Sequence, residues 1–167
     1  MLDLQGLITE FFATVRSQEI EIYNEFSFQH ELGIYLRNEL PDYKVQFERN
    51  VAYFLPGANT IKKEIDIAVF NKDKRERYAF ELKYPNNGQY PAQMYSFVKD
   101  IKFMEELKAL GFTKTCCVVL VSDRPFYQGN INEGIYRYFR EEFSVYGDVF
   151  KHTGQGKGEE YISLAGR

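Results

Sequence analysis

The chain has 167 residues, enough for one domain with a hydrophobic core, and we expect residues 1–167 to form a single domain. Hydrophobic residues make up 44% and charged residues 27%, which excludes a disordered or fibrous chain. The net charge of −3 argues against broad nonspecific binding to nucleic acid. Since no apolar run suits a membrane span or a signal peptide, we expect a cytoplasmic protein with no membrane contact.

Two helices and one strand are predicted in the first third of the chain. Apolar residues recur at helical spacing from Leu4 to Val15, which predicts an amphipathic helix over residues 3–17. A second helix is expected over residues 27–39, with Ser27 as its N-cap and Pro41 beyond its end. A strand is predicted over residues 43–48, with a possible continuation to residue 54.

Residues 64–83 predict a β-hairpin whose polar turn covers residues 71–76. Side chains alternate between the two faces of a strand, so Asp66 lies on the face opposite to Ile65 and Ile67. A turn centred on residues 73 and 74 pairs Asp66 with Glu81, Ala68 with Ala79, and Glu64 with Lys83.

The pairing of Asp66 with Glu81 brings two negative charges together. Opposed residues have Cβ atoms roughly 4.5–5.5 Å apart, a distance at which two carboxylates repel. We therefore expect a positive group between them, and a divalent cation and Lys83 are the candidates.

The second half of the chain predicts a helix, a strand and a further helix. Helical periodicity starting at Gln93 ends before Gly111, and residues 114–122 read as a strand buried on both faces. Residues 130–142 look helical, and residues 161–164 form a last edge strand. Cys116 and Cys117 are adjacent and point to opposite faces of their strand, so we expect reduced thiols.

Asp66 followed by Glu81-Leu82-Lys83 resembles the active-site hairpin of the PD-(D/E)xK nuclease superfamily, with Ile65 in place of the nominal proline. The resemblance covers about residues 27–122. It implies an α/β (α+β) fold with a restriction-endonuclease-like αβββαβ core, in which a mixed central sheet is flanked by helices. An N-terminal helix and a C-terminal helix and strand extend this core.

The resemblance also implies the chemistry of the site. Asp66, Glu81 and the main-chain carbonyl of Leu82 would hold Mg²⁺ or Mn²⁺, and Lys83 would position the attacking water. The substrate would be a phosphodiester in nucleic acid, with DNA favoured over RNA. A homodimer or a separate recognition subunit would help to bind it.

Three further residues are candidates near this site. Glu31 either ligates the metal, as an acidic residue on the preceding helix does in many family members, or makes surface ion pairs. Glu64 shares the face of Asp66 and is expected to pair with Lys83 or to lie at the mouth of the cleft. Gln93 matches a glutamine that reaches the site in some branches, and Gln89 competes for that role.

Two other functions stay open. One is a non-catalytic nucleic-acid-binding or assembly module that keeps the nuclease fold, and the acidic net charge favours it. The other is a small α/β protein whose hairpin is exposed and carries no site. Residues 62–114 hold 11 Lys and Arg against 8 Asp and Glu, so the segment with the candidate site is the basic part of the chain.

Overall fold

The computed structural model describes residues 1–86 and 88–165. Its elements in chain order are α1 (Leu4–Arg16), α2 (Glu25–Glu39), β1 (Lys44–Asn50), the 3-10 turn η1 (Val51–Tyr53), β2 (Glu64–Phe70), β3 (Arg77–Lys83), α3 (Tyr90–Ala109), β4 (Lys114–Val119), α4 (Arg124–Tyr127), α5 (Tyr136–Arg140), β5 (Gly147–Phe150) and β6 (Tyr161–Leu164). Among the described residues, no helix is long and apolar enough to cross a membrane.

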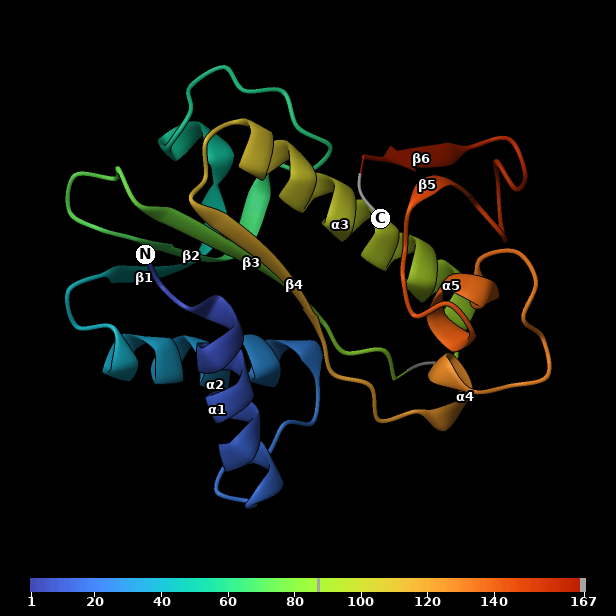
Figure 1. Ribbon diagram of the computed structural model, residues 1–167, viewed down its shortest axis with the longest axis horizontal. Coiled ribbons are helices and arrows are strands. Elements are labelled where there is room, and N and C mark those ends of the chain that lie inside the picture. The colour runs from blue at the N-terminus through green and yellow to red at the C-terminus, as the bar shows by residue number, and fades with distance from the viewer. Residues whose placement is uncertain (87, 166–167) are drawn as a thin grey trace.

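The central sheet has four strands in the order β1-β2-β3-β4. β1 and β3 both run antiparallel to β2, and β4 runs parallel to β3. A parallel neighbour needs a crossover connection, which α3 supplies between β3 and β4. The fold is therefore mixed α+β with a mixed sheet (Figure 1).

Helices cover both faces of this sheet (Figure 1). On one face, α1 and α2 bury Phe11, Phe28 and Leu32 in a cluster that includes Ile67 and Phe80 of the hairpin. On the other face, α3 packs through a second cluster, with the buried members Ile65, Ala68, Ala79, Phe103, Met104 and Leu107. The hairpin strands are thus buried on both faces, which excludes a solvent-exposed hairpin.

The hairpin register is the predicted one where the two strands pair, but the common face expected for Ile65 and Ile67 is wrong, because Ile65 packs in the α3 cluster and Ile67 in the α1–α2 cluster. Ala68 pairs with Ala79 and Ile67 with Phe80, and the turn occupies the residues between Phe70 and Arg77. Both alanines lie in the cluster that packs against α3.

Several predicted boundaries are corrected near the site. The N-cap of α2 is Asn24 and not Ser27: the Asn24 side chain accepts a hydrogen bond from the Ser27 N–H at 2.6 Å, and the Ser27 hydroxyl accepts one from the Asn24 N–H, which completes a capping box. α3 begins at Tyr90, earlier than Gln93, because Pro91 suits the first turn of a helix. β1 ends at Asn50, whose side chain accepts a hydrogen bond from the Ala52 N–H and starts the 3-10 turn.

The prediction that residues 114–122 form a strand buried on both faces is wrong. β4 is an edge strand of the sheet, and most of its side chains are half-buried. Its apolar side chains pack against the helices on both faces of the sheet: Val118 joins the α1–α2 cluster, and Cys117 packs against the α3 cluster. Both cysteines are free thiols.

The C-terminal part differs from the prediction in its helices. Residues 130–142 do not form one helix, because Gly134 adopts a φ of 59° and the chain turns there before α5. Arg140 holds this turn by donating to the carbonyl of Ile131 at 2.7 Å. The predicted strand at residues 161–164 is present as β6, but it pairs with β5 in a separate two-stranded sheet that packs on α3.

Candidate functional site

Asp66 and Glu81 meet where β2 and β3 stop pairing. The recorded β2–β3 pairs end at Ile67 and Phe80, one residue before the two acids. Past this point each carboxylate binds a main-chain N–H of the opposite strand. Glu81 Oε1 accepts from the Asp66 N–H at 3.2 Å, and Asp66 Oδ2 accepts from the Leu82 N–H at 2.7 Å. The two acids are thus fixed between the strands by hydrogen bonds.

The positive group beside this pair is Lys62, which the sequence prediction did not include. Its ammonium group contacts the carboxylate of Glu81, a side chain with no exposed surface, and lies 2.8 Å from Asp100 Oδ1. Lys62 lies in the loop before β2, where neither strand alternation nor helical spacing marks it. The sequence marks Lys62 only by its place two residues before Glu64, the acidic first residue of the hairpin.

Asp100 on α3 connects this lysine to Lys83. Asp100 is buried, with 2% of its surface exposed, and its Oδ2 lies 3.3 Å from the Lys83 ammonium group. Lys83 also lies 3.6 Å from Glu25 at the start of α2. Charged side chains therefore alternate in sign from Glu81 to Glu25 across the end of the sheet. The sequence prediction also missed Asp100. Asp100 lies one turn before Phe103 and two turns before Leu107, on the buried face of α3, and a charged residue on such a face is a candidate site residue.

The site carries more negative than positive charge. Four carboxylates (Glu25, Asp66, Glu81 and Asp100) face the two ammonium groups of Lys62 and Lys83. Burial is the main cause that raises the pKa of Asp66 and of Glu81, and the charge of Asp66 raises the pKa of Glu81 further. Burial works to lower the pKa of each lysine, but the neighbouring carboxylates outweigh it and raise the pKa of both. The lysines are therefore held as cations, and the acid pair favours an added proton or cation.

A cavity of about 300 Å³ opens beside Asp66 on the side of α2. Its lining residues are Glu25, Phe26, Gln29, Glu48, Asp66 and Leu82. The Gln29 side chain donates to the main-chain carbonyl of Asp66 at 2.9 Å and also to Glu48. Glu48 has a φ of 46°, in the left-handed region that costs a non-glycine residue about 1–2 kcal/mol. Backbone strain of this kind is often found at functional sites.

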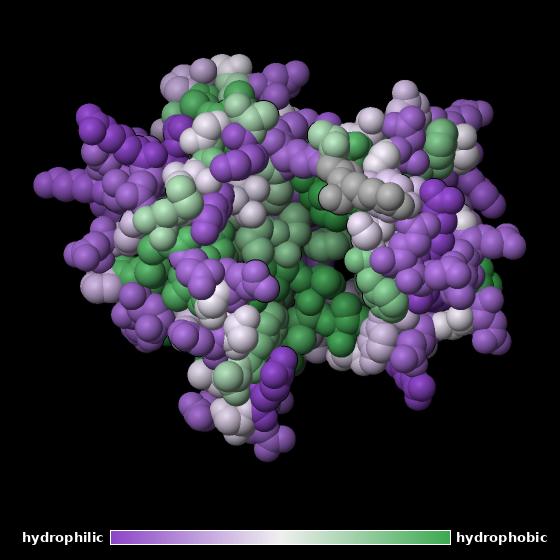
Figure 2. Space-filling model, in the orientation of Figure 1, coloured by the Kyte–Doolittle hydropathy of each residue, from purple (hydrophilic) through white to green (hydrophobic). Residues whose placement is uncertain are grey.

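A larger groove of about 740 Å³ lies between the start of α1 and the outer edge of β4, where Figure 2 shows hydrophobic surface in the middle of this face. Among the described residues that line it, Asp3 is the one with a carboxylate, and that carboxylate already caps α1 by accepting from the Gly6 N–H. This groove therefore offers no acid pair, and the candidate site is the charged cluster at the end of the hairpin.

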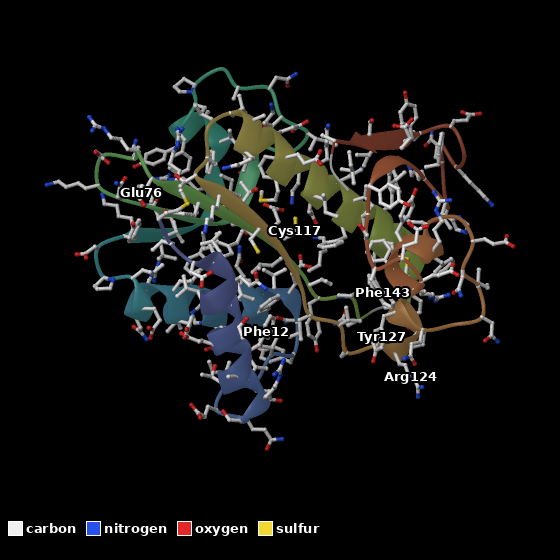
Figure 3. All side chains as sticks on the ribbon, in the orientation of Figure 1. Phe12, Glu76, Cys117, Arg124, Tyr127 and Phe143 are labelled. Carbon is white, nitrogen blue, oxygen red and sulfur yellow. The ribbon has the colours of Figure 1, made fainter. Side chains whose placement is uncertain are left out.

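Cys117 borders the charged cluster from β4. It pairs with Glu81 in the register of β3 and β4, and its side chain lies on the side of β4 that faces α3 (Figure 3). Burial, followed by the charges of Asp100 and Glu81, raises the pKa of the Cys117 thiol. The thiol is therefore protonated and contributes no charge to the site.

The structure separates the remaining candidates. Glu31 lies 3.7 Å from the ring of its neighbour His30, and the α2 residues that line the cavity with Asp66 are Glu25, Phe26 and Gln29. Glu64 is exposed and pairs in register with Asn50; the part of the chain described here has no ion pair between Glu64 and Lys83. This favours the surface alternative for Glu31 and corrects the pairing expected for Glu64.

Gln93 does lie beside Lys83. Both residues line a cavity of about 50 Å³, and the Gln93 Oε1 atom is buried there without a hydrogen-bond partner. Gln89 is the N-cap position of α3 and makes no side-chain capping bond. The geometry thus places Gln93, and not Gln89, next to the candidate lysine.

The oxygen atoms at the acid pair suit a hard divalent cation. The Leu82 N–H points at Asp66, and because the N–H and C=O of a strand residue share one edge, its carbonyl faces the same gap. Two carboxylates and a carbonyl are donors that Mg²⁺ and Mn²⁺ accept. Within residues 1–86 and 88–165, no group of three or more His, Cys, Asp or Glu side chains is arranged to hold a metal. A cation at the pair would have to share Glu81 with Lys62 or displace its ammonium group.

Comparisons of the chain with models of protein families, with curated proteins and with solved structures each give no match. What the chain does must therefore be inferred from its own side chains and their arrangement.

Proposed function

We propose that this chain is a divalent-metal-dependent nuclease of the PD-(D/E)xK superfamily that hydrolyses phosphodiester bonds in DNA. The observation that carries the proposal is the meeting of Asp66 and Glu81 between neighbouring strands, in a cluster with excess negative charge. Lys83 follows Glu81 by two residues and ends in the same cluster. The spacing of these three residues matches the motif of the superfamily.

The order of elements supports the same proposal. The segment from α2 to β4 has the order helix, three strands, helix, strand, as expected for a restriction-endonuclease-like core. α1 and the segment after β4 are additions to this core. The acid pair lies at the end of the β2–β3 hairpin, where α2 and α3 both reach it from opposite faces.

Each residue has a role that follows from its contacts. A divalent cation would polarise the phosphodiester and lower the pKa of a bound water. Asp66, Glu81 and the Leu82 carbonyl would hold that cation. Lys83, held as an ammonium group by Asp100 and Glu25, would place positive charge where the transition state gains negative charge. Gln29, bonded to the Asp66 carbonyl, would orient the strand that carries the first acid.

A non-catalytic module is the second candidate, and one contact favours it. Lys62 already neutralises Glu81, so the buried carboxylate is stable without a metal. In that case the cluster would be a structural ion network and nucleic acid would be bound without cleavage.

A cleavage assay separates the two functions. Purified protein is incubated with single-stranded, duplex and branched DNA and with RNA, in Mg²⁺ or in EDTA. The nuclease proposal expects cleavage of a DNA substrate in Mg²⁺ only, lost in Glu81→Gln and kept in Lys72→Ala, a control on the exposed hairpin turn. Binding that Glu81→Gln does not change, without cleavage, would support the module. Neither binding nor cleavage would contradict both.

A further inference from the structure

Phe26 is an exposed aromatic side chain in the lining of the cavity beside Asp66. It is 73% exposed, whereas Phe28, Leu32 and Leu36, which anchor α2 to the sheet, have no exposed surface. Phenylalanine is usually buried, and α2 is anchored without this one. The sheet therefore holds α2 without Phe26, and the ring of Phe26 is accessible at the cavity.

The position of Phe26 is fixed by its helix. It lies in the first turn of α2, where Asn24 and Ser27 hold each other through the capping box. The neighbouring Glu25 contacts Lys83. The ring is thus attached to a capped helical turn, one residue after the Glu25 that lies 3.6 Å from the candidate catalytic lysine. A rigid ring loses little conformational freedom when a flat ligand stacks on it.

The rest of the cavity decides which ligand fits the ring. Glu48 and Asp66 line the same cavity, so an anion such as a phosphate group would be repelled from this part of the site. A flat, uncharged ring with N–H donors would stack on Phe26 and find acceptor oxygens of Glu48 and Asp66 in the same cavity. A nucleobase has these properties, and about 300 Å³ lies at the lower end of the range for small-ligand pockets.

We propose that Phe26 is a stacking platform for one unpaired nucleobase next to the bond that is cut, which rests on the nuclease function proposed above. Bases inside a duplex are already stacked on both sides. A base can stack on Phe26 only in a single strand, at a frayed end or branch, or after leaving the helix. The protein therefore selects nucleic acid with an unpaired base over continuous duplex.

The test compares Phe26→Ala, Phe26→Tyr and Phe143→Ala on a single-stranded DNA, its duplex, and the same strand with abasic positions. Phe143 is 72% exposed and outside this cavity, so it matches Phe26 in exposure; Figure 3 labels it in the C-terminal part of the chain, which reaches Phe143 shortly after the end of α5. Dissociation constants are measured in Mg²⁺ in a Lys83→Ala background, and kcat/KM in the otherwise native protein.

Phe26→Ala is expected to weaken single-strand binding and kcat/KM about 5- to 100-fold, since stacking contributes about 1–3 kcal/mol per base. Phe26→Tyr and Phe143→Ala should stay within about threefold of the parent, because a ring is kept at position 26. The loss should disappear on the abasic strand. Equal effects of Phe26→Ala and Phe143→Ala, or an equal loss on duplex, would overturn the inference.

The same experiment distinguishes failure of the inference from failure of the proposed function. Single-strand binding that depends on Phe26, without any cleavage by the native protein, would refute the nuclease and leave Phe26 as a base-binding residue with no cut bond beside it. Cleavage that Phe26→Ala does not change would refute the platform alone. If the native protein binds no nucleic acid, both are refuted.

Discussion

The ammonium group of Lys62 contacts the carboxylate of Glu81, which has no exposed surface. A buried carboxylate needs a partner, because an isolated charge in a protein interior is strongly unfavourable. Lys62 comes from a loop and keeps 30% of its side chain exposed, so it can leave the pair more easily than the strand residues can. We therefore expect Lys62 and a divalent cation to compete for Glu81.

Replacing Lys62 by Met tests this competition. Metal-free Lys62→Met should be less stable than the native protein by about 1–3 kcal/mol, with the larger loss at the higher pH, where Glu81 takes up a proton less readily. Mn²⁺ should then raise the Tm of Lys62→Met more than that of the native protein, because no ammonium group has to move. Thermal unfolding in EDTA and in Mn²⁺ measures both effects. Lys63→Met, at the exposed neighbouring position, is the control, and an equal Mn²⁺ shift in all three proteins would exclude competition.

The stability of the metal-free protein should fall as the pH rises from about 5 to about 8. Burial is the main cause that raises the pKa of Asp66 from 3.8 to about 6 and that of Glu81 from 4.5 to about 8. The folded protein therefore holds protons in this range that the unfolded chain has released. These bound protons stabilise the folded protein fully at a pH below the pKa values of the unfolded chain. The stabilisation is lost as the pH rises through the pKa values of the folded protein.

The expected loss is on the order of 2–4 kcal/mol in the free energy of unfolding. Urea denaturation in EDTA at several pH values measures it. Glu81→Gln should flatten the curve between about pH 6 and 8, because the group that titrates there is removed. If the stability of the native protein increased over this range, burial and repulsion would not raise the pKa values of the two acids.

Asp66→Asn and Lys83→Met should separate metal binding from catalysis. Asp66 is a proposed ligand, so Asp66→Asn should weaken Mn²⁺ binding by at least about 10-fold. Lys83 is proposed to act on the transition state, so Lys83→Met should lower kcat by about 10²–10³-fold and leave Mn²⁺ affinity within about threefold. Calorimetric titration and a cleavage assay measure the two properties, and Lys72→Met serves as the control.

We also expect Lys83→Met to lower the stability of the fold. Lys83 contacts the buried Asp100, which would lose this partner and keep its contact with Lys62 after the substitution. A Tm below that of Lys72→Met is expected for this reason. Loss of Mn²⁺ affinity in Lys83→Met equal to that in Asp66→Asn would mean that Lys83 supports the metal site and not the transition state.

The hairpin could be predicted from the sequence because its signals are local. Alternation of apolar residues and a polar turn of six residues placed Ala68 opposite Ala79, as the structure confirms. The charged network could not be predicted in the same way. Lys62 lies in a loop and Asp100 on a helix, and only the packing of α3 against the sheet brings them to Glu81.

Errors elsewhere have the same physical origin. β4 has an apolar sequence because both of its faces pack against helices. The sequence does not reveal that β4 is the edge strand of the sheet in the described part of the chain. The aromatic residues around α5 suggested one long helix, but Gly134 and the hydrogen bond from Arg140 to Ile131 favour a turn. In each case tertiary contacts decided a structure that local periodicity left open.

The central claim is that Asp66 and Glu81 hold a divalent cation for phosphodiester hydrolysis. The measurement that tests it most directly is the cleavage rate of native protein and Asp66→Asn, purified in parallel, on the DNA substrate that the native protein cuts fastest in Mg²⁺. We predict a rate at least about 10²-fold lower in Asp66→Asn, and no cleavage by either protein in EDTA. Equal rates in the two proteins would contradict the claim, since any cleavage would then come from another site or another protein.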